Sequence, residues 1–375
     1  MTKVYIGRGA LNALVSILTE VKPQRILLVT GKSSYDQHPL RGLLEQQLQG
    51  FQVQRHSEFQ VNPTLDDLVH GAQVKQAFAP HLIIGIGGGS VLDTAKLLKV
   101  LPTEEQAIVE TISSERAIQE NNAPLILLPT TAGSGSEATH FAVAYMGKKK
   151  YSVASPYLLP NYTLVDAALT DSMPAYLTAV SGFDALAQAI ESYWNIKATK
   201  ESLAYATESI SLILPHLEKV VLTPCPASRD ALSKAAYLAG KAINITKTTA
   251  PHALSYGFTL NYGIPHGHAV MLTLPALLRH QSTDAIAVLH TVSPKHYNER
   301  MLKLYHLFGK ANGAEVADYL EKLMDKLGLQ RRLQDFAIPL DDLSMLVAHV
   351  NVERLNNHPV RLTPKDLMQI LEAIY

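Results

Sequence analysis

A run of three glycines between two apolar stretches constrains the fold more than any other feature of the sequence. Residues 85–96 read GIGGGSVLDTAK; residues 81–86 have the character of a buried strand, and residues 91–100 that of a helix. Glycines let the backbone approach a ligand closely, and a helix N-terminus offers free N–H groups and a partial positive charge. The segment therefore predicts a strand–turn–helix unit that can hold a pyrophosphate. The alternative is a glycine-rich turn without a ligand.

Short apolar runs and amphipathic stretches alternate over the first part of the chain. Strand-like runs cover residues 25–30, 51–56, 81–86 and 124–129, and helical spacing covers residues 39–48, 65–76 and 91–100. This alternation predicts a mostly parallel sheet covered by helices. Helical patterns dominate after about Asp171, over residues 176–194, 200–217, 228–243, 302–308, 316–327 and 364–373. We therefore expect an α/β domain over residues 1–170 and an all-α domain over residues 171–375.

Composition narrows the class of protein. A chain of 375 residues is too long for one ordinary core. Lys plus Arg and Asp plus Glu both number 33, so net charge gives no reason to expect nucleic acid or an anionic membrane as a partner. The single cysteine, Cys225, excludes an internal disulfide and fits a reducing cytoplasm. The N-terminus does not resemble a signal peptide, and no apolar run reaches the length of a membrane span, so we expect a cytoplasmic protein.

A second loop has the composition of a ligand site. Residues 129–137 read PTTAGSGSE and follow the strand-like run at 124–129. Small hydroxyl residues among glycines at the carboxyl end of a strand fit a ligand crevice. Thr130, Thr131 and Ser134 are the candidate contacts, and a flexible surface loop is the alternative.

Four polar residues of the second half form a possible metal site. Asp184 and Gln188 are one turn apart on an otherwise apolar helix, so they share a face. His252 and His266 follow in the segments APHALSY and GIPHGHA. A carboxylate, a carboxamide and two imidazoles could hold a divalent cation that polarises a substrate oxygen. Each histidine alone could equally be a hydrogen-bonded core residue.

Taken together, these segments resemble a known family. GGGSVLDTAK, LPTTAGSGSE, DALAQAIES and the pair APH and PHGHA are similar to the iron-containing (group III) alcohol dehydrogenases over nearly the whole chain. The resemblance implies an N-terminal Rossmann-like domain and a C-terminal helical domain, the architecture of dehydroquinate synthase. It also implies a cleft between the domains, where hydride passes from a nicotinamide to a carbonyl on a metal, and at least a homodimer.

The resemblance also assigns roles to residues. It implies that the metal ligands are Asp184, His252 and His266. It implies that Lys150 lies near the cofactor ribose, whereas Lys148 and Lys149 fit a solvated turn. It implies that the cofactor is held by Gly87, Gly88, Gly89, Ser90, Asp93, Thr130, Thr131 and Ser134.

Two residues depart from the family pattern. Gln188 stands where the family has a histidine ligand, and Tyr256 stands where it often has another histidine. An amide oxygen is neutral, like imidazole, but it is a weaker donor to a transition metal. Three outcomes stay open: Fe²⁺ or Zn²⁺ held by all four residues, a loosely held ion, or no ion with Gln188 bonded to substrate.

The segment Asn244–His252 indicates a narrower resemblance. It is similar to the phosphonoacetaldehyde reductase (2-hydroxyethylphosphonate dehydrogenase) branch, and it places Lys247 among three threonines. A lysine flanked by hydroxyls suits the anionic head of a short aldehyde. The alternative is a polar helix end with an exposed lysine.

Cofactor choice and proton donor are less constrained. Many NAD-specific relatives have an aspartate at the position of Gly31, and its absence beside Lys32 favours NADPH or use of both NADPH and NADH. Tyr256, His268 and a water–ribose relay are the candidate proton donors. Two rival functions remain: a sugar-phosphate cyclase-type lyase of the same architecture, and a nucleotide-binding relative without activity.

Overall fold

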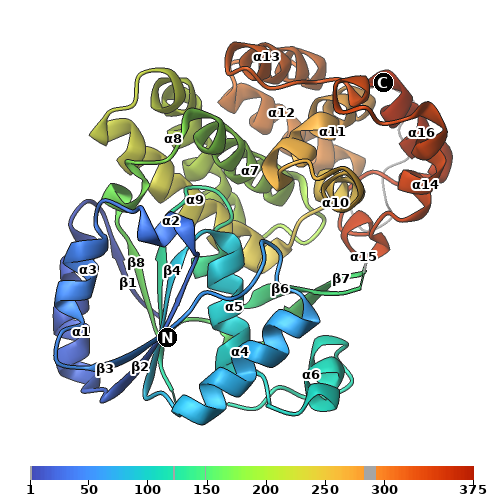
Figure 1. Ribbon diagram of the computed structural model, residues 1–375. Helices are drawn as coiled ribbons and strands as arrows, with labels where there is room; N and C mark the ends of the chain where they lie inside the picture. The colour runs from blue at the N-terminus through green and yellow to red at the C-terminus, as the bar shows by residue number, and fades with distance from the viewer. Residues whose placement is uncertain (1, 121–122, 148, 283–292) are drawn as a thin grey trace. The chain divides into compact units, whose positions relative to one another are not determined.

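The computed structural model describes residues 2–120, 123–147, 149–282 and 293–375 (Figure 1). It divides into two compact units, one ending at Met173 and the other beginning at Pro174. The division falls where strand patterns give way to helical ones in the sequence. Lys148, the first residue of the lysine run, lies outside the described residues. None of the helices in the described ranges combines the length and the apolar character that a membrane span requires.

The N-terminal unit is built on a six-stranded sheet in which every neighbouring pair of strands is parallel. In spatial order the strands are β1 (Lys3–Ile6), β8 (Tyr162–Val165), β5 (Leu125–Pro129), β4 (Leu82–Gly87), β2 (Arg25–Thr30) and β3 (Gln52–His56). A separate antiparallel hairpin consists of β6 (Phe141–Met146) and β7 (Lys149–Ala154). The predicted parallel sheet is confirmed.

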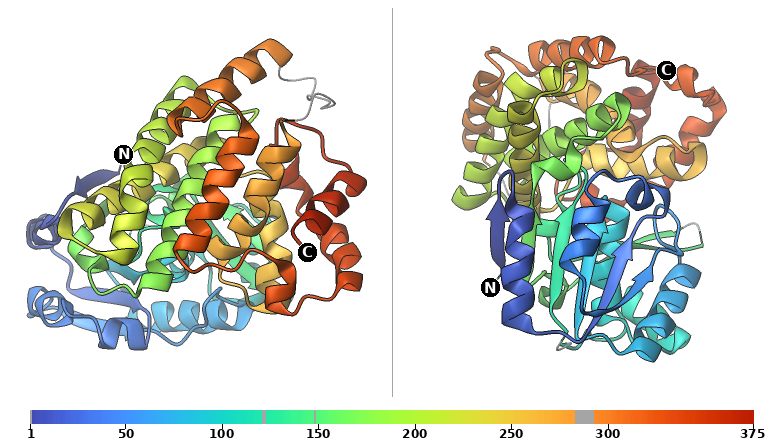
Figure 2. Two further views of the ribbon diagram at one scale, coloured as in Figure 1. Left: turned by 90° about the horizontal axis from the view of Figure 1, so that it is seen from above. Right: turned by 60° about the vertical axis from the view of Figure 1, so that its left-hand side comes forward.

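Helices cover both faces of this sheet, as Figures 1 and 2 show. The helices of the unit are α1 (Ala13–Val21), α2 (Ser33–Asp36), α3 (Arg41–Gln47), α4 (Leu65–Phe78), α5 (Gly89–Val100) and α6 (Glu105–Ile112). Successive strand side chains point to opposite faces. In β2, Ile26 and Leu28 share one cluster with α1 and α3, whereas Leu27 and Val29 share another with α4 and α5. Burial on both faces explains the continuous apolar runs.

The strand order reverses next to β2. The chain passes from β2 to β3 on one side and then returns to β4 on the other side of β2. Ligands of open α/β sheets bind at such a switch point, outside the carboxyl ends of the strands. Gly31 follows β2 at this edge, and the glycine-rich turn follows β4.

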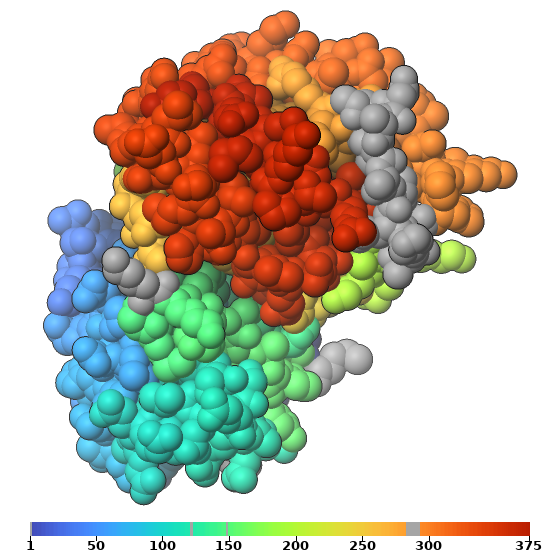
Figure 3. All heavy atoms as spheres, turned by 90° about the vertical axis from the view of Figure 1, so that its right-hand side faces the viewer, coloured from blue at the N-terminus to red at the C-terminus, as the bar shows by residue number. Residues whose placement is uncertain are grey.

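The C-terminal unit is helical, as predicted. Its helices are α7 (Ala175–Trp194), α8 (Lys200–Leu222), α9 (Pro226–Thr246), α10 (Ala250–Tyr262), α11 (His266–His280), α12 (Pro294–Leu307), α13 (Gly313–Lys326), α14 (Leu343–Ala348), α15 (Val352–Leu355) and α16 (Pro364–Ala373). Helix α7 is buried along most of its length and packs against α8, α9 and α11. Helix α14 packs on α16 at the surface of this unit (Figure 3). Helices α10 and α11, which carry the two candidate histidines, were not among the predicted segments.

Candidate cofactor and metal sites

The glycine-rich turn and the second loop meet at the edge of the sheet. Strands β4 and β5 are neighbours, and the backbone N–H of Thr130, just after β5, donates to the carbonyl of Gly87 at 3.0 Å. A Cβ built on Gly89 would lie 3.0 Å from the Cβ and Oγ of Ser134, so any other residue here would require Ser134 to shift by a few tenths of an ångström. The structure therefore brings the predicted residues of both loops together beside the switch point.

Three other predicted cofactor residues have defined places in the N-terminal unit. The two carboxylate oxygens of Asp93 accept hydrogen bonds from Ser136 Oγ at 2.5 Å and from the backbone N–H of Val143 at 3.0 Å. Ser90 Oγ accepts from the backbone N–H of Asn62 at 3.1 Å. Lys150 lies on β7, opposite Tyr145 of β6. Asp93 is thus engaged with the segment that follows the second loop.

The carboxyl end of β2 is held by an arginine from β3. Arg55 donates from Nε to Thr30 Oγ1 at 2.7 Å and from Nη2 to the carbonyl of Gly31 at 2.8 Å. Its Nη1 bonds Asp36, and this hydrogen bond lowers the pKa of that carboxyl group. Lys32 is exposed and pairs with Glu58 at 2.8 Å. The turn after β2 therefore begins with a glycine and a lysine and is held by Arg55.

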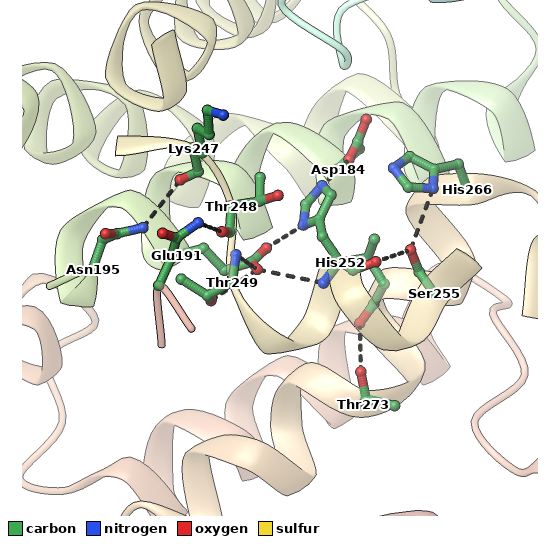
Figure 4. A network of polar contacts seen from close by, with 12 residues as sticks. Asp184, Glu191, Asn195, Lys247, Thr248, Thr249, His252, Ser255, His266 and Thr273 are labelled. Carbon is green, nitrogen blue, oxygen red and sulfur yellow. Dashed lines mark hydrogen bonds and ion pairs between the residues drawn. The ribbon is translucent and has the colours of Figure 1, made fainter. Parts of the chain in front are cut away.

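The three candidate metal ligands converge within the C-terminal unit. Asp184 comes from α7, His252 from α10 and His266 from α11, and one ligand atom of each lies within 4.8 Å of the others. Figure 4 shows their side chains directed toward one another. Nε2 of His252 is 3.3 Å from Oδ1 of Asp184, and the two imidazole rings are 5.2 Å apart. Gln188 is also buried, one helical turn after Asp184.

A close helix contact at Gly267 allows this convergence. A Cβ built on Gly267 would lie 2.0 Å from the carbonyl oxygen of Val180 and 2.9 Å from the Cβ of Asp184. The first turn of α11 therefore presses directly on α7 because Gly267 has no side chain. This contact places His266 beside Asp184.

Sequence reasoning missed one residue of the candidate metal site, Glu191. Its side chain is fully buried on α7 and accepts hydrogen bonds from the backbone N–H of Thr249 at 2.8 Å, from Thr249 Oγ1 at 3.0 Å and from Nδ1 of His252 (Figure 4). A hydrogen bond from Nδ1 places the proton of a neutral imidazole on that nitrogen. The lone pair of Nε2 is then available to bind a metal ion. The signal in the sequence was spacing, since Asp184, Gln188 and Glu191 follow one another at i, i+4 and i+7.

The residues fit a divalent metal ion. Oδ1 of Asp184 is buried and receives no aligned hydrogen bond from the described residues. A carboxylate oxygen with two imidazole nitrogens is a donor set that suits zinc or ferrous iron. Burial alone would lower the pKa of His252, but Glu191 and Asp184 flank the ring and raise it to about 10. Two carboxylates thus surround one imidazole, and a metal ion that bound Nε2 of His252 would displace a proton from it.

Tyr256 and His268 lie in different surroundings. The ring of Tyr256 stacks on His266, with centroids 6.2 Å apart and planes 18° apart. His268 is buried, and its ring nitrogens bond the hydroxyl of Tyr176 at 3.0 Å and the carbonyl of Gln330 at 2.8 Å. Of these two candidate proton donors, only Tyr256 contacts a candidate metal ligand.

Lys247 links α9 to α10 in a strained conformation. Its φ of 62° and ψ of −176° belong to a region that is nearly exclusive to glycine. Its Nζ pairs with Glu353 at 2.9 Å, and Figure 4 shows the side chain pointing away from His252. Glu191 already occupies the N-terminus of α10, where an anionic ligand would otherwise be favoured.

A separate cavity lies elsewhere in the C-terminal unit. It has a volume of about 450 Å³ and is lined by residues of α11, α13 and α16 together with Arg331 and Arg332. None of the predicted site residues lines it. The cavity therefore adds nothing to the candidate metal site.

Comparison with known proteins gives consistent matches. Residues 1–167 match the family described as iron-containing alcohol dehydrogenase, and residues 178–375 match the C-terminal region of the same family. A long-chain-alcohol dehydrogenase 1 of Geobacillus thermodenitrificans is 28% identical over 391 residues, which cover 99% of this chain and 94% of the relative. A phosphonoacetaldehyde reductase of Streptomyces viridochromogenes is 30% identical over 321 residues, which cover 82% of this chain and 80% of the relative.

A solved structure supports the same relationship. The sulfoacetaldehyde reductase of Bifidobacterium kashiwanohense, in complex with NAD⁺, matches with a TM-score of 0.89 and 26% identity. The match covers 100% of this chain and 96% of that one. The predicted combination of a Rossmann-like unit and a helical unit is therefore confirmed as the fold of known dehydrogenases.

Proposed function

The chain belongs to the iron-containing alcohol dehydrogenase family, and on this premise we propose that it reduces a small aldehyde to its alcohol with NADPH or NADH. The observation that carries the proposal is the convergence of Asp184, His252 and His266 from three helices, with Glu191 behind His252. A ligand whose orientation is already fixed by a hydrogen bond, as that of His252 is by Glu191, suits metal-assisted carbonyl chemistry.

The N-terminal unit would bind the dinucleotide. The glycine turn after β4 and the hydroxyl loop after β5 lie side by side at the carboxyl edge of the sheet, where a pyrophosphate can approach the start of α5. Gly31 and Lys32 follow β2, and Lys32 could pair with the 2′-phosphate of NADPH if that phosphate displaced the exposed carboxylate of Glu58. We therefore propose NADPH, or dual use of both cofactors.

The C-terminal unit would bind the metal and the aldehyde. Asp184, His252 and His266 would hold Fe²⁺ or Zn²⁺, and the amide oxygen of Gln188 would be a weaker fourth donor. A bound ion would polarise the aldehyde carbonyl so that it accepts hydride more readily. Tyr256, stacked on His266, is the residue we propose to supply a proton to the product oxygen.

Phosphonoacetaldehyde is the substrate we propose within this class. The support is the segment around Lys247 and the relatives whose names specify anionic aldehydes. Because Lys247 pairs with Glu353, the phosphonate would have to displace an exposed carboxylate. Lys247→Ala should therefore raise KM for phosphonoacetaldehyde far more than KM for a neutral aldehyde of similar size. Glu353→Gln should lower the first KM and leave the second unchanged. Equal effects on both aldehydes would exclude the anion-binding role.

A panel of aldehydes, assayed with each reduced cofactor and with metal content measured on the same sample, tests the whole proposal. We expect stoichiometric consumption of NAD(P)H and a bound divalent ion. A product formed without net NAD(P)H consumption would indicate a lyase of the dehydroquinate synthase type. Retained dinucleotide binding without turnover of any aldehyde would indicate a relative that only binds nucleotides.

A further inference from the structure

A fully buried lysine lies beneath the two loops of the N-terminal unit. Lys96, on α5, is completely buried. Its Nζ donates to the carbonyl and Oγ of Ser136 at 2.9 and 3.2 Å, to Thr139 Oγ1 at 2.9 Å and to the carbonyl of Phe141 at 2.5 Å. A buried ammonium group is costly unless it is fully hydrogen-bonded. All these acceptors lie between residues 136 and 141, so Lys96 holds one short segment.

Asp93 holds the same segment from the preceding turn of α5. Positions i and i+3 of a helix share a face, and Asp93 and Lys96 are so spaced. The carboxylate of Asp93 accepts from Ser136 Oγ and from the backbone N–H of Val143. An acid and a base on one face of α5 therefore fix residues 136–143 through backbone and hydroxyl groups. We refer to Asp93 and Lys96 together as the α5 clamp.

The clamp joins the two loops that the cofactor proposal invokes. Helix α5 begins inside the glycine-rich turn, and residues 136–143 directly continue the hydroxyl loop. Near the start of the helix, a Cβ built on Gly89 would lie 3.0 Å from the side chain of Ser134. The two loops are therefore closely packed at this point. A change in the distance between α5 and residues 136–143 would therefore move Ser134 relative to Gly89.

The electrostatic surroundings support a charged clamp. Nζ of Lys96 lies 4.0 Å from Oδ1 of Asp93. Burial lowers the pKa of Lys96 to about 8, so the ammonium form still predominates at neutral pH. Burial raises the pKa of the neighbouring Glu137 to about 7. Lys96 is thus the positive charge of a buried cluster that also contains the carboxyl groups of Asp93 and Glu137. The charges of this cluster largely compensate one another.

We propose that Asp93 and Lys96 are positioning residues that hold the glycine-rich turn and the hydroxyl loop at the spacing a dinucleotide requires. Asp93 then acts through Ser136 and Val143, not through its own contact with the cofactor. The inference rests on the proposed function, because it assumes that these loops bind NAD(P)H.

Three variants test the clamp by titration of NADH and NADPH into the full-length protein. Lys96→Met removes the donors while keeping the volume, and Ser136→Ala removes one partner of both clamp residues at a lower cost to folding. Lys99→Met is the matched control, because Lys99 is a buried lysine of the same helix that bonds Leu159 and Asn161 instead. We expect Lys96→Met to weaken dinucleotide binding roughly tenfold or more and Ser136→Ala to weaken it less. KM for the cofactor should rise with Kd, whereas metal content should stay unchanged.

The control variant and the wild-type protein distinguish a failure of the clamp proposal from a failure of the proposed function. Unchanged dinucleotide affinity in Ser136→Ala and in any folded Lys96→Met protein would overturn the clamp. An equal loss in Lys99→Met would also overturn it, because general loosening of α5 would then be sufficient. If the wild-type protein bound neither dinucleotide, the proposed function itself would fall, and the clamp with it.

Discussion

Replacing Glu191 by glutamine is the sharpest test of how the metal site is held. In the native protein the carboxylate receives hydrogen bonds from Thr249 and from Nδ1 of His252. A glutamine has one acceptor oxygen and a donating amide group. If its oxygen faces Thr249, its amide faces Nδ1 and favours the tautomer with a proton on Nε2. If its oxygen faces His252, the amide opposes the N–H and O–H donors of Thr249.

Both orientations predict a weaker metal site. A proton on Nε2 removes the lone pair that faces Asp184, whereas poor contacts at Thr249 displace the first turn of α10. Loss of such an orienting partner costs about 10- to 100-fold in metal affinity, which is roughly 1.4–2.7 kcal/mol. Because hydrogen bonds to a charged group are lost, we also expect the free energy of unfolding to fall by about 2–4 kcal/mol.

Zinc titration of metal-free Glu191→Gln, beside urea unfolding of the same protein, measures both effects. Trp194→Phe is the control, because the indole Nε1 donates to Thr249 Oγ1 and its loss loosens the same helix start without removing the carboxylate. We expect Trp194→Phe to lose stability with little change in metal affinity. Zinc affinity that stays within about twofold of wild type in a folded Glu191→Gln protein would refute the reasoning.

Three further changes probe other parts of the structure. Gln188→His should raise zinc affinity about tenfold or more, measured by the same titration, because imidazole is a stronger donor than an amide oxygen; unchanged affinity would mean that position 188 does not face the ion. Gly267→Ala should cost both stability and metal, since its Cβ would meet the Val180 carbonyl at 2.0 Å; a stable, metal-replete Gly267→Ala protein would contradict this close contact. Burial lowers the pKa of His56 from 6.5 to about 4, so the unfolded chain takes up a proton in this range that the native chain does not. The free energy of unfolding should therefore fall with decreasing pH between 6.5 and 4, by at most about 1.4 kcal/mol per pH unit from this residue, and urea unfolding of His56→Leu should show a flatter profile.

Strands β2, β4 and β5 could be predicted because they are buried continuous apolar runs, and β3 because its residues alternate. Strands β1 and β8 were missed, and β8 has only four residues although all of them are buried. Strand β1 is mostly exposed, and its register partner for Lys3 is Tyr162, so its pairing is non-local. Helix α11 was missed for a different reason, because Pro275 lies inside it and interrupts the helical pattern that sequence reasoning follows. Helix α10 was missed although Pro251, in its first turn, is compatible with a helix start.

The candidate site could also be predicted only in part from the sequence. Residue type and family resemblance selected Asp184, His252 and His266 as candidate ligands, but their convergence depends on the contact at Gly267, which is a property of packed helices. Glu191 was missed because its partner Thr249 lies 58 residues further along the chain. A buried carboxylate becomes interpretable only when the group that it bonds is known.

The arrangement of side chains along α7 also bears on whether Gln188 indicates a site that no longer binds a metal ion. Asp184 and Glu191 are both buried, and both contact the single imidazole of His252. Burying two carboxylates around one ring costs desolvation energy, and apolar residues of similar volume often replace such buried ionic groups without loss of stability. A chain without use for a cation would therefore gain little from this arrangement. Since Glu191 fixes the ring of His252 independently of residue 188, the glutamine would weaken one candidate ligand while leaving Asp184, His252 and His266 in place. We therefore expect a metal site of reduced affinity, not a lost one.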